Sequence, residues 1–215
     1  MSADQTTIAA IARFESYLQA DPTNVRLWIE VGDLYHQSGR FNEGQACFEK
    51  VLLLDPPHSV AKSRLAGVFL SQQRFVEATR LFQDALNDNP ENASLRHNLG
   101  ITLFYQHRWE EAEQSFSEAD RCGLNLPANL AYWARSLHYQ EKLAEATAIA
   151  QRWLASANTT ESKGYLALLT MDSGDMVQAE SLALEALKED PTNTDAATVA
   201  GHAAIEQQRI EDGSK

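Results

Sequence analysis

The sequence has few cysteines, a shortage of basic residues and no long apolar stretch. Its 215 residues include two cysteines, Cys47 and Cys122, without CxxC spacing, which excludes a disulfide framework and a cysteine-based zinc site. Lys and Arg number 18 against 30 Asp and Glu, a formal net charge of −12, and this excludes a general binder of nucleic-acid phosphates. No stretch is long and apolar enough to span a bilayer, and the first residues lack the features of a secretory signal. We therefore expect a cytoplasmic protein with neither nucleic acid nor membrane as partner.

Catalytic motifs are missing as well. The sequence contains no HExxH, no GxxxxGK[ST] and no GxSxG, and no GxGxxG follows a strand pattern. Acidic runs such as residues 110–113 and 188–190 fit the solvated face of a helix better than a carboxylate or cation site. We expect no enzyme activity, no cofactor and no metal site.

An internal repeat organises the chain. Pairs of Asp or Asn with Pro begin at Asp21, Asp55, Asn89 and Asp190, at spacings of 34, 34 and 101 residues. Between them recurs a short turn followed by a large apolar residue, so each period predicts two helices and two turns. The predicted organisation is a capping half-repeat over 1–24, five repeats over 25–58, 59–92, 93–126, 127–159 and 160–193, and a partial sixth repeat or C-terminal cap over 194–215.

The residues within this period resemble the tetratricopeptide repeat family. The first repeat carries the family's large, small, aromatic and proline positions at Trp28, Val31, Gly32, Tyr35, Gly44, Phe48, Val51 and Pro56. The second and third repeats follow this pattern, whereas the fourth and fifth have Ala150 and Ala183 in place of the second-helix aromatic. The resemblance covers nearly the whole chain and implies an all-α fold, a right-handed α-solenoid of stacked helix-turn-helix repeats.

The pattern also predicts how the helices pack. Small residues that permit close approach recur once in each first helix, at Gly32, Ala66, Gly100, Ala134, Ala167 and Gly201. In the fourth repeat Trp133 and Trp153 fall on predicted apolar faces, which suggests that the volume of the missing aromatic has been relocated. A helical pair cannot bury its apolar face alone, so neighbouring pairs must stack.

The C-terminal end has the pattern of an incomplete repeat. The helix predicted from residue 194 is rich in small apolar residues, whereas a cap is expected to be polar on its outer face. This composition favours a piece of a longer protein over a terminal cap. It also leaves open a homo-oligomer in which two copies cover each other's ends.

The resemblance places a binding site on the concave face of the first helices. At the groove positions of the third and fourth repeats the sequence has His97, Ile101, Phe104, Tyr105, Arg135, His138 and Tyr139. Aromatic and arginine side chains are enriched at interface anchors, so we predict a peptide-binding groove here, with an acidic C-terminal end that includes Glu161 and Asp195. The alternative is that Phe104 and one tyrosine pack between repeats while the others cover them.

Histidines are frequent at these groove positions. They are His36, His97, His138 and His202, whereas His58 and His107 fall in turns. Because an imidazole titrates near pH 6.5, the pattern predicts pH-dependent binding of a charged ligand. The alternative is that these side chains are solvated spectators.

The sequence thus predicts a non-enzymatic scaffold that binds a peptide or protein segment in its concave groove. The alternatives are the substrate-recruiting region of a longer glycosyl-, methyl- or sulfotransferase, and a self-assembling module. A clamp for chaperone C-terminal carboxylates is disfavoured, because Ile29 and Asp33 stand where such clamps carry Lys and Asn. The asparagine ladder of the O-linked glycosyltransferase superhelix is matched at Asn98 alone.

Overall fold

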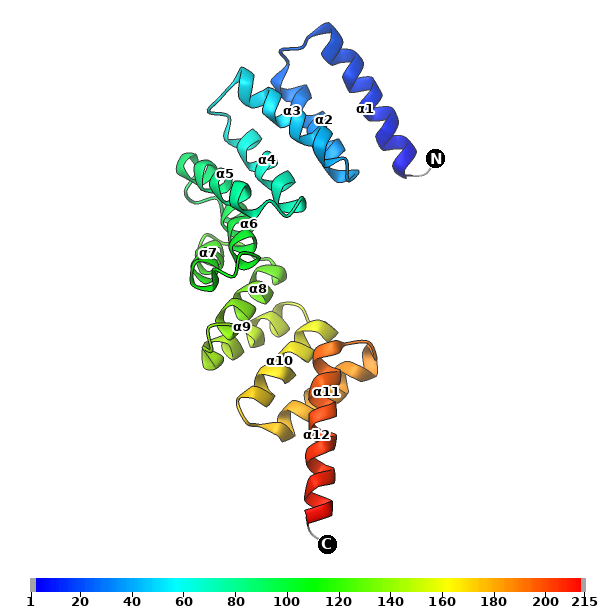
Figure 1. The fold of residues 1–215 in the computed structure, drawn as a ribbon, viewed down its shortest axis with the longest axis vertical. Helices are drawn as coiled ribbons and strands as arrows, with labels where there is room; N and C mark the ends of the chain where they lie inside the picture. Colours follow the sequence, from blue (N-terminus) through cyan, green and yellow to red (C-terminus); the bar gives the residue numbers. More distant parts are fainter. Residues whose placement is uncertain (1–2, 214–215) are drawn as a thin grey trace. The chain divides into compact units, whose positions relative to one another are not determined.

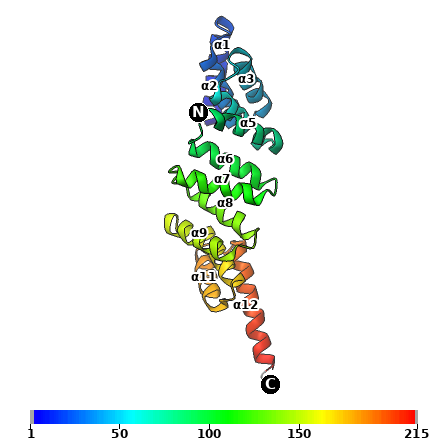
Figure 2. The same cartoon turned by 90° about the vertical axis from the view of Figure 1, so that its left-hand side faces the viewer.

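The computed structural model describes residues 3–213, with side chains described over 6–209. Within this range the secondary structure consists of twelve α-helices and no strand (Figures 1 and 2). The predicted all-α solenoid fold is confirmed. None of the described helices is both long and apolar enough to cross a membrane.

The helices form two compact units, one ending at His107 and the other beginning at Arg108. The N-terminal unit contains α1 (Ala3–Ala20), α2 (Val25–Gln37), α3 (Phe41–Leu54), α4 (Ser59–Ser71), α5 (Phe75–Asp88) and α6 (Ala93–Phe104). The C-terminal unit contains α7 (Trp109–Arg121), α8 (Pro127–His138), α9 (Leu143–Ser156), α10 (Thr160–Asp172), α11 (Met176–Glu189) and α12 (Thr194–Gly213). In each unit consecutive helices pack as antiparallel hairpins that stack on one another.

The tight turns within the hairpins are closed by a residue in the left-handed conformation. Gly39 has φ 75° and Gly174 has φ 94°, a region that glycine adopts without steric cost. Gln73 and Glu141 adopt φ 60° and 61° at the corresponding turns. The backbone requirement is therefore the same in each turn, although the residue that meets it differs.

The longer turns between hairpins explain the recurring proline pairs. The backbone N–H of Asp190 donates to Ala186 O at 2.9 Å, and Pro191 then prevents the helix from continuing. The Asp190 carboxylate accepts from Thr192 N at 2.9 Å, and Asn193 Oδ1 caps α12 by accepting from Ala196 N at 2.9 Å. The turn before α2 uses Asp21, Thr23 and Asn24 in the same way. His58, which the sequence placed in a turn, caps α4 through Nδ1.

The glycine in α2 shows why small residues recur in the first helices. A Cβ atom added to Gly32 would lie 2.6 Å from Cε1 of the fully buried Phe48 ring, so the ring occupies the space that a side chain would need. The same expectation is wrong for Gly201. This residue is exposed, and beyond the adjoining backbone of α12 no described atom comes within 4 Å of its added Cβ.

Candidate peptide-binding site

The seven predicted site residues are divided between the two units. His97, Ile101, Phe104 and Tyr105 belong to α6 and its C-cap in the N-terminal unit. Arg135, His138 and Tyr139 belong to α8 and its C-cap in the C-terminal unit, where all three line one pocket.

In the N-terminal group, Tyr105 presents the largest surface. It is 48% exposed, and its ring stacks on Phe75 of α5 with centroids 5.5 Å apart, while Phe104 meets its edge. His97 is 7% exposed and offers little surface to a ligand. The equivalent residues Ala131 and Gly164 are buried as well, so this helix position contributes less to an open groove than the sequence predicts.

The C-terminal pocket has a volume of about 490 Å³ and is formed by α8, α10, α12 and the turn before α12. Its lining residues are Arg135, His138, Tyr139, Thr160, Glu161, Tyr165, Leu168, Asp190, Thr192, Asn193, Thr194 and Asp195. The volume lies within the range of ~300–1,000 Å³ that is typical of ligand sites. The lining is polar and aromatic, which suits the recognition of a polar side chain or backbone segment.

Arg135 is fixed in place by an ion pair and by aromatic rings. Its Nη2 atom lies 2.9 Å from Glu161 Oε1, and its guanidinium carbon lies 5.2 Å and 5.0 Å from the ring centroids of Trp153 and Tyr165. A planar guanidinium stacks well on such rings. Arg135 is therefore ordered before any ligand arrives.

His138 bridges α8 and α10 from the wall of the same pocket. Its Nε2 lies 3.0 Å from Asp172 Oδ2, and its Nδ1 lies 3.0 Å from the hydroxyl of Tyr165. A neutral imidazole satisfies both contacts when Nε2–H donates to Asp172 and Nδ1 accepts from the tyrosine hydroxyl. Burial raises the pKa of Tyr165 well above its usual range, which keeps this hydroxyl a donor.

Tyr139 is the exposed aromatic of the pocket. It is 60% exposed, and its ring stacks on Trp109, the first residue of α7, with centroids 4.5 Å apart and an interplanar angle of 21°. Both predicted tyrosines thus rest against the first aromatic of a preceding second helix and still face solvent. Both tyrosines therefore pack between repeats and remain exposed, and their anchor role stays a prediction.

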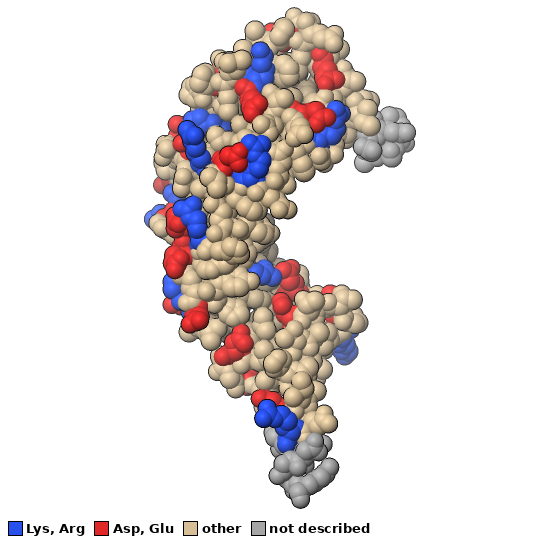
Figure 3. Space-filling model, in the orientation of Figure 1, with Lys and Arg blue, Asp and Glu red and all other residues tan. Residues whose placement is uncertain are grey.

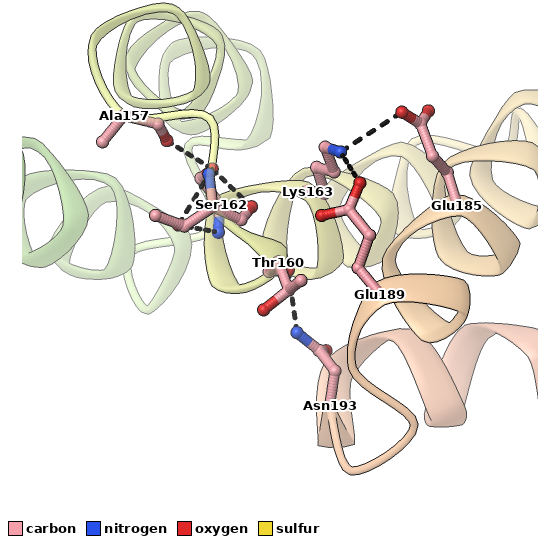
Figure 4. Close-up of polar contacts among 8 residues, drawn as sticks. Ala157, Thr160, Ser162, Lys163, Glu185, Glu189 and Asn193 are labelled. Atoms are coloured by element: carbon pink, nitrogen blue, oxygen red, sulfur yellow. Dashed lines mark hydrogen bonds and ion pairs between the residues drawn. The ribbon is translucent and has the colours of Figure 1, made fainter.

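Asn193 joins the starts of the two helices that border the pocket (Figure 4). Its Nδ2 donates to Thr160 O at 2.8 Å, while its Oδ1 caps α12. A Cβ atom at Gly164 would lie 2.3 Å from Asn193 Oδ1, so the glycine leaves room for this contact. Behind it, the buried Lys163 pairs with Glu185 at 3.2 Å and Glu189 at 2.6 Å (Figure 4).

Asp195 in the first turn of α12 is half-buried in the pocket wall and makes no hydrogen bond or ion pair with any described residue. Burial raises the pKa of its carboxyl group; Glu161 adds to the rise, and Arg135 and His138 oppose it. By contrast, hydrogen bonds from Thr192 lower the pKa of Asp190.

Several pocket residues were not identified as site residues from the sequence. Thr160 and Tyr165 line the pocket from α10, and Asn193 reaches it because Gly164 leaves room for its side chain. The sequence could have predicted the position of Asn193, because an Asn that closely follows an Asx-Pro pair, here Asp190-Pro191, is typical of a helix N-cap. In the described part of the chain, no group of three or more His, Cys, Asp or Glu side chains is placed to hold a metal ion.

These features define a class of protein, an all-α solenoid of helix-turn-helix repeats with a pocket on its first helices. A family model described as tetratricopeptide repeat matches residues 3–66 and 69–125, and the chain belongs to the tetratricopeptide repeat family. The matched stretches end before the helices that carry Ala150 and Ala183.

Comparisons with individual proteins agree with this assignment. Superkiller protein 3 of Saccharomyces cerevisiae is 36% identical over 53 residues, which cover 25% of this chain and 4% of that protein. The structure of YrrB, described as a tetratricopeptide repeat protein with an unusual peptide-binding site, has a TM-score of 0.76 at 17% identity and covers 87% of this chain and 97% of its own. PilF of Pseudomonas aeruginosa has a TM-score of 0.80 at 17% identity, covering 93% and 91%. At these identities the structural likenesses show the fold alone.

Proposed function

We propose that the chain is a non-enzymatic interaction scaffold that binds a peptide or protein segment along its first helices. The observation that carries this proposal is the pocket of about 490 Å³ in the C-terminal unit, lined by Arg135, His138 and Tyr139. Rigid rings and a guanidinium that is already oriented bind a partner at low entropic cost.

Two further observations support the proposal. Repeat proteins of this family are typically interaction scaffolds, and the similar fold of YrrB carries a peptide-binding site according to its description. In the N-terminal unit, the exposed ring of Tyr105 offers a second contact of the same type. We assign Ile101 and Phe104, both partly exposed, to the surface that surrounds it.

Selection from a displayed library of random peptides tests the proposal. Peptides that bind the C-terminal unit should bind Arg135→Ala and Tyr139→Ala more weakly by ~1–3 kcal/mol each, as measured by calorimetry. Peptides that bind the N-terminal unit should be weakened to the same degree by Tyr105→Ala. Tyr17→Ala is the control, because Tyr17 is 44% exposed on α1, outside the proposed surface.

Two results would contradict the proposed function. One is a wild-type chain that selects no peptide above the blank matrix. The other is a set of selected peptides that all three variants bind as tightly as the wild type does.

The exposed side of α12 favours a second candidate, self-association. Gly201, Ala204 and Ile205 are exposed there, and Ile205 is exposed by 59%. If two copies cover this surface, light scattering should show a mass that falls on roughly hundredfold dilution, and Ala200→Glu should lower the mass at the concentrations where the wild-type chain associates. A mass that stays that of one chain throughout would exclude this candidate.

A further inference from the structure

The pocket in the C-terminal unit has an unbalanced charge. Its lining includes the carboxylates of Glu161, Asp190 and Asp195, whereas Arg135 is its one permanently charged cation among the described side chains. The whole chain has the same sign, with a formal net charge of −12. A positively charged segment would therefore be attracted at long range by the negative net charge of the chain, and would then meet negative charge in the pocket as well.

Arg135 offsets the charge of Glu161, with which it is already paired, and leaves the carboxylates of Asp190 and Asp195. Glu161 accepts from its guanidinium, and the rings of Trp153 and Tyr165 lie beside it. Its side chain is 24% exposed, against 63% for the side chain of Glu161. The Glu161 carboxylate therefore keeps most of its surface available to a ligand, while the positive charge of Arg135 is balanced by this ion pair.

Asp195 combines partial burial with the lack of an ion pair among the described residues. Basic side chains lie beside acidic ones over much of the surface in Figure 3, and pairs such as Lys62–Asp88 at 3.3 Å and Arg152–Asp120 at 2.9 Å are typical. Asp195 has no such partner among the described residues although it is half-buried. A desolvated carboxylate without a partner gains more from an arriving cation than an exposed carboxylate does.

We propose that the segment bound in this pocket is basic, and that one of its Lys or Arg side chains pairs with Asp195 and Glu161 beside the ring of Tyr139. This inference rests on the proposed function, since it names the chemistry of the partner at the same site. Tyr139 suits the role because its exposed ring attracts a cation as well as apolar surface.

The peptide selection described above tests the inference when the selected sequences are read for composition. Peptides chosen by the wild-type chain should be enriched in Lys and Arg relative to the starting library. Replacing the critical Lys or Arg with Met in a selected peptide should weaken its binding to the wild-type chain roughly tenfold. Asp195→Asn should weaken the unmodified peptide to a similar degree, and Asp195→Lys should select peptides rich in Asp and Glu instead.

A matched control separates this effect from a general change in charge. Glu145→Gln removes one carboxylate from an exposed position in α9, outside the pocket, and should leave the affinity unchanged. Circular dichroism should show the same helix content in all of these variants.

The outcomes distinguish the inference from the proposed function. Two results overturn the basic-segment inference while the scaffold function stands. In one, the selected peptides require Tyr139 and Arg135 but carry no excess of Lys and Arg. In the other, the peptides bind Asp195→Asn as tightly as they bind the wild-type chain. Selection of acidic peptides by the wild-type chain has the same consequence. A wild-type chain that selects no peptide overturns both.

Discussion

The helices α2 to α5 and the helices α8 to α11 bury their large rings in different places. In α3 and α5 the rings of Phe48 and Phe82 are completely buried inside a helical pair. The equivalent residues of α9 and α11 are Ala150 and Ala183, which are also completely buried. In α8 to α11 the ring volume lies at the contact between pairs, where Trp153 joins a core cluster built by α8, α9 and α10. Phe116 of α7, by contrast, keeps the buried ring at the repeat position.

This difference shows how a departure from the repeat pattern can build a site. Trp153 is 3% exposed and Tyr165 is 5% exposed, and together they form the aromatic surface on which Arg135 rests. Trp133 packs against the same cluster, in line with the relocation of volume that the sequence predicts. Ala150, which departs from the family pattern, therefore lies in the same core cluster as Trp153 and Tyr165, the two rings that position Arg135.

Removing a ring from the N-terminal unit should have the largest effect on stability. Phe82→Ala should lower the free energy of unfolding by ~3–5 kcal/mol, because it opens a cavity at a fully buried position. Urea denaturation measures the loss, and hydrogen exchange should locate it in α4 and α5. If α9 and α10 lose protection equally, the two units do not differ in the way that their cores suggest.

Adding a ring to the C-terminal unit tests whether the volume has moved. Ala150→Phe should cost ~1–3 kcal/mol, because the space next to Ala150 is already filled within the cluster that contains Trp153. The double variant with Trp153→Leu should recover part of that loss. If Ala150→Phe alone leaves the free energy of unfolding unchanged, the ring of Trp153 has not taken up the space next to Ala150.

The glycines provide a comparison within the C-terminal unit itself. Gly164→Ala should cost ~1–3 kcal/mol, since its Cβ would displace Asn193 and break the cap of α12 and the bond to Thr160. Gly201→Ala, at an open helical position, should instead stabilise the chain by ~0.5–1 kcal/mol. Thermal unfolding of both variants measures the two changes in stability. Equal changes would show that Asn193 does not make the contacts to Thr160 and Ala196 that Gly164 leaves room for.

The smallest expected effect concerns the pH dependence of stability in the ligand-free chain. Burial raises the folded-state pKa of Asp195, so the ionised carboxylate destabilises the fold. The stability that the protonated carboxyl group contributes at low pH is lost as the pH rises through this folded-state pKa. Arg135 and His138 from α8 and Glu161 from α10 face this carboxylate. Asp195→Asn should therefore raise the unfolding temperature slightly near pH 7, and the gain should vanish below about pH 3.9, the unperturbed value.

The control for this measurement is Glu145→Gln, which should show no comparable change with pH. If Asp195→Asn instead lowers the unfolding temperature near neutral pH, the carboxylate stabilises the start of α12 more than its burial costs.

The sequence predicted the fold well because a period of 34 residues repeats its spacing signals many times. It also placed Arg135, His138 and Tyr139 together at one helix end, where all three line the pocket, and their role in binding stays a prediction. It did not predict the pocket lining at Asn193, because that contact depends on the space left by Gly164 some thirty residues earlier. It also placed His97 in the groove, although this side chain is 7% exposed, because helical periodicity alone does not determine how deeply a position is buried.

The stack between Tyr139 and Trp109 gives the pocket an intrinsic optical reporter. Tyr139 lines the pocket, and the two ring centroids lie 4.5 Å apart. A ligand that settles on Tyr139 will shift this stack and change the polarity around the indole, so the fluorescence of Trp109 should respond to occupancy without any attached dye. Pocket occupancy could then be followed in solution, in real time, with Tyr139→Leu as the variant in which the optical response is lost.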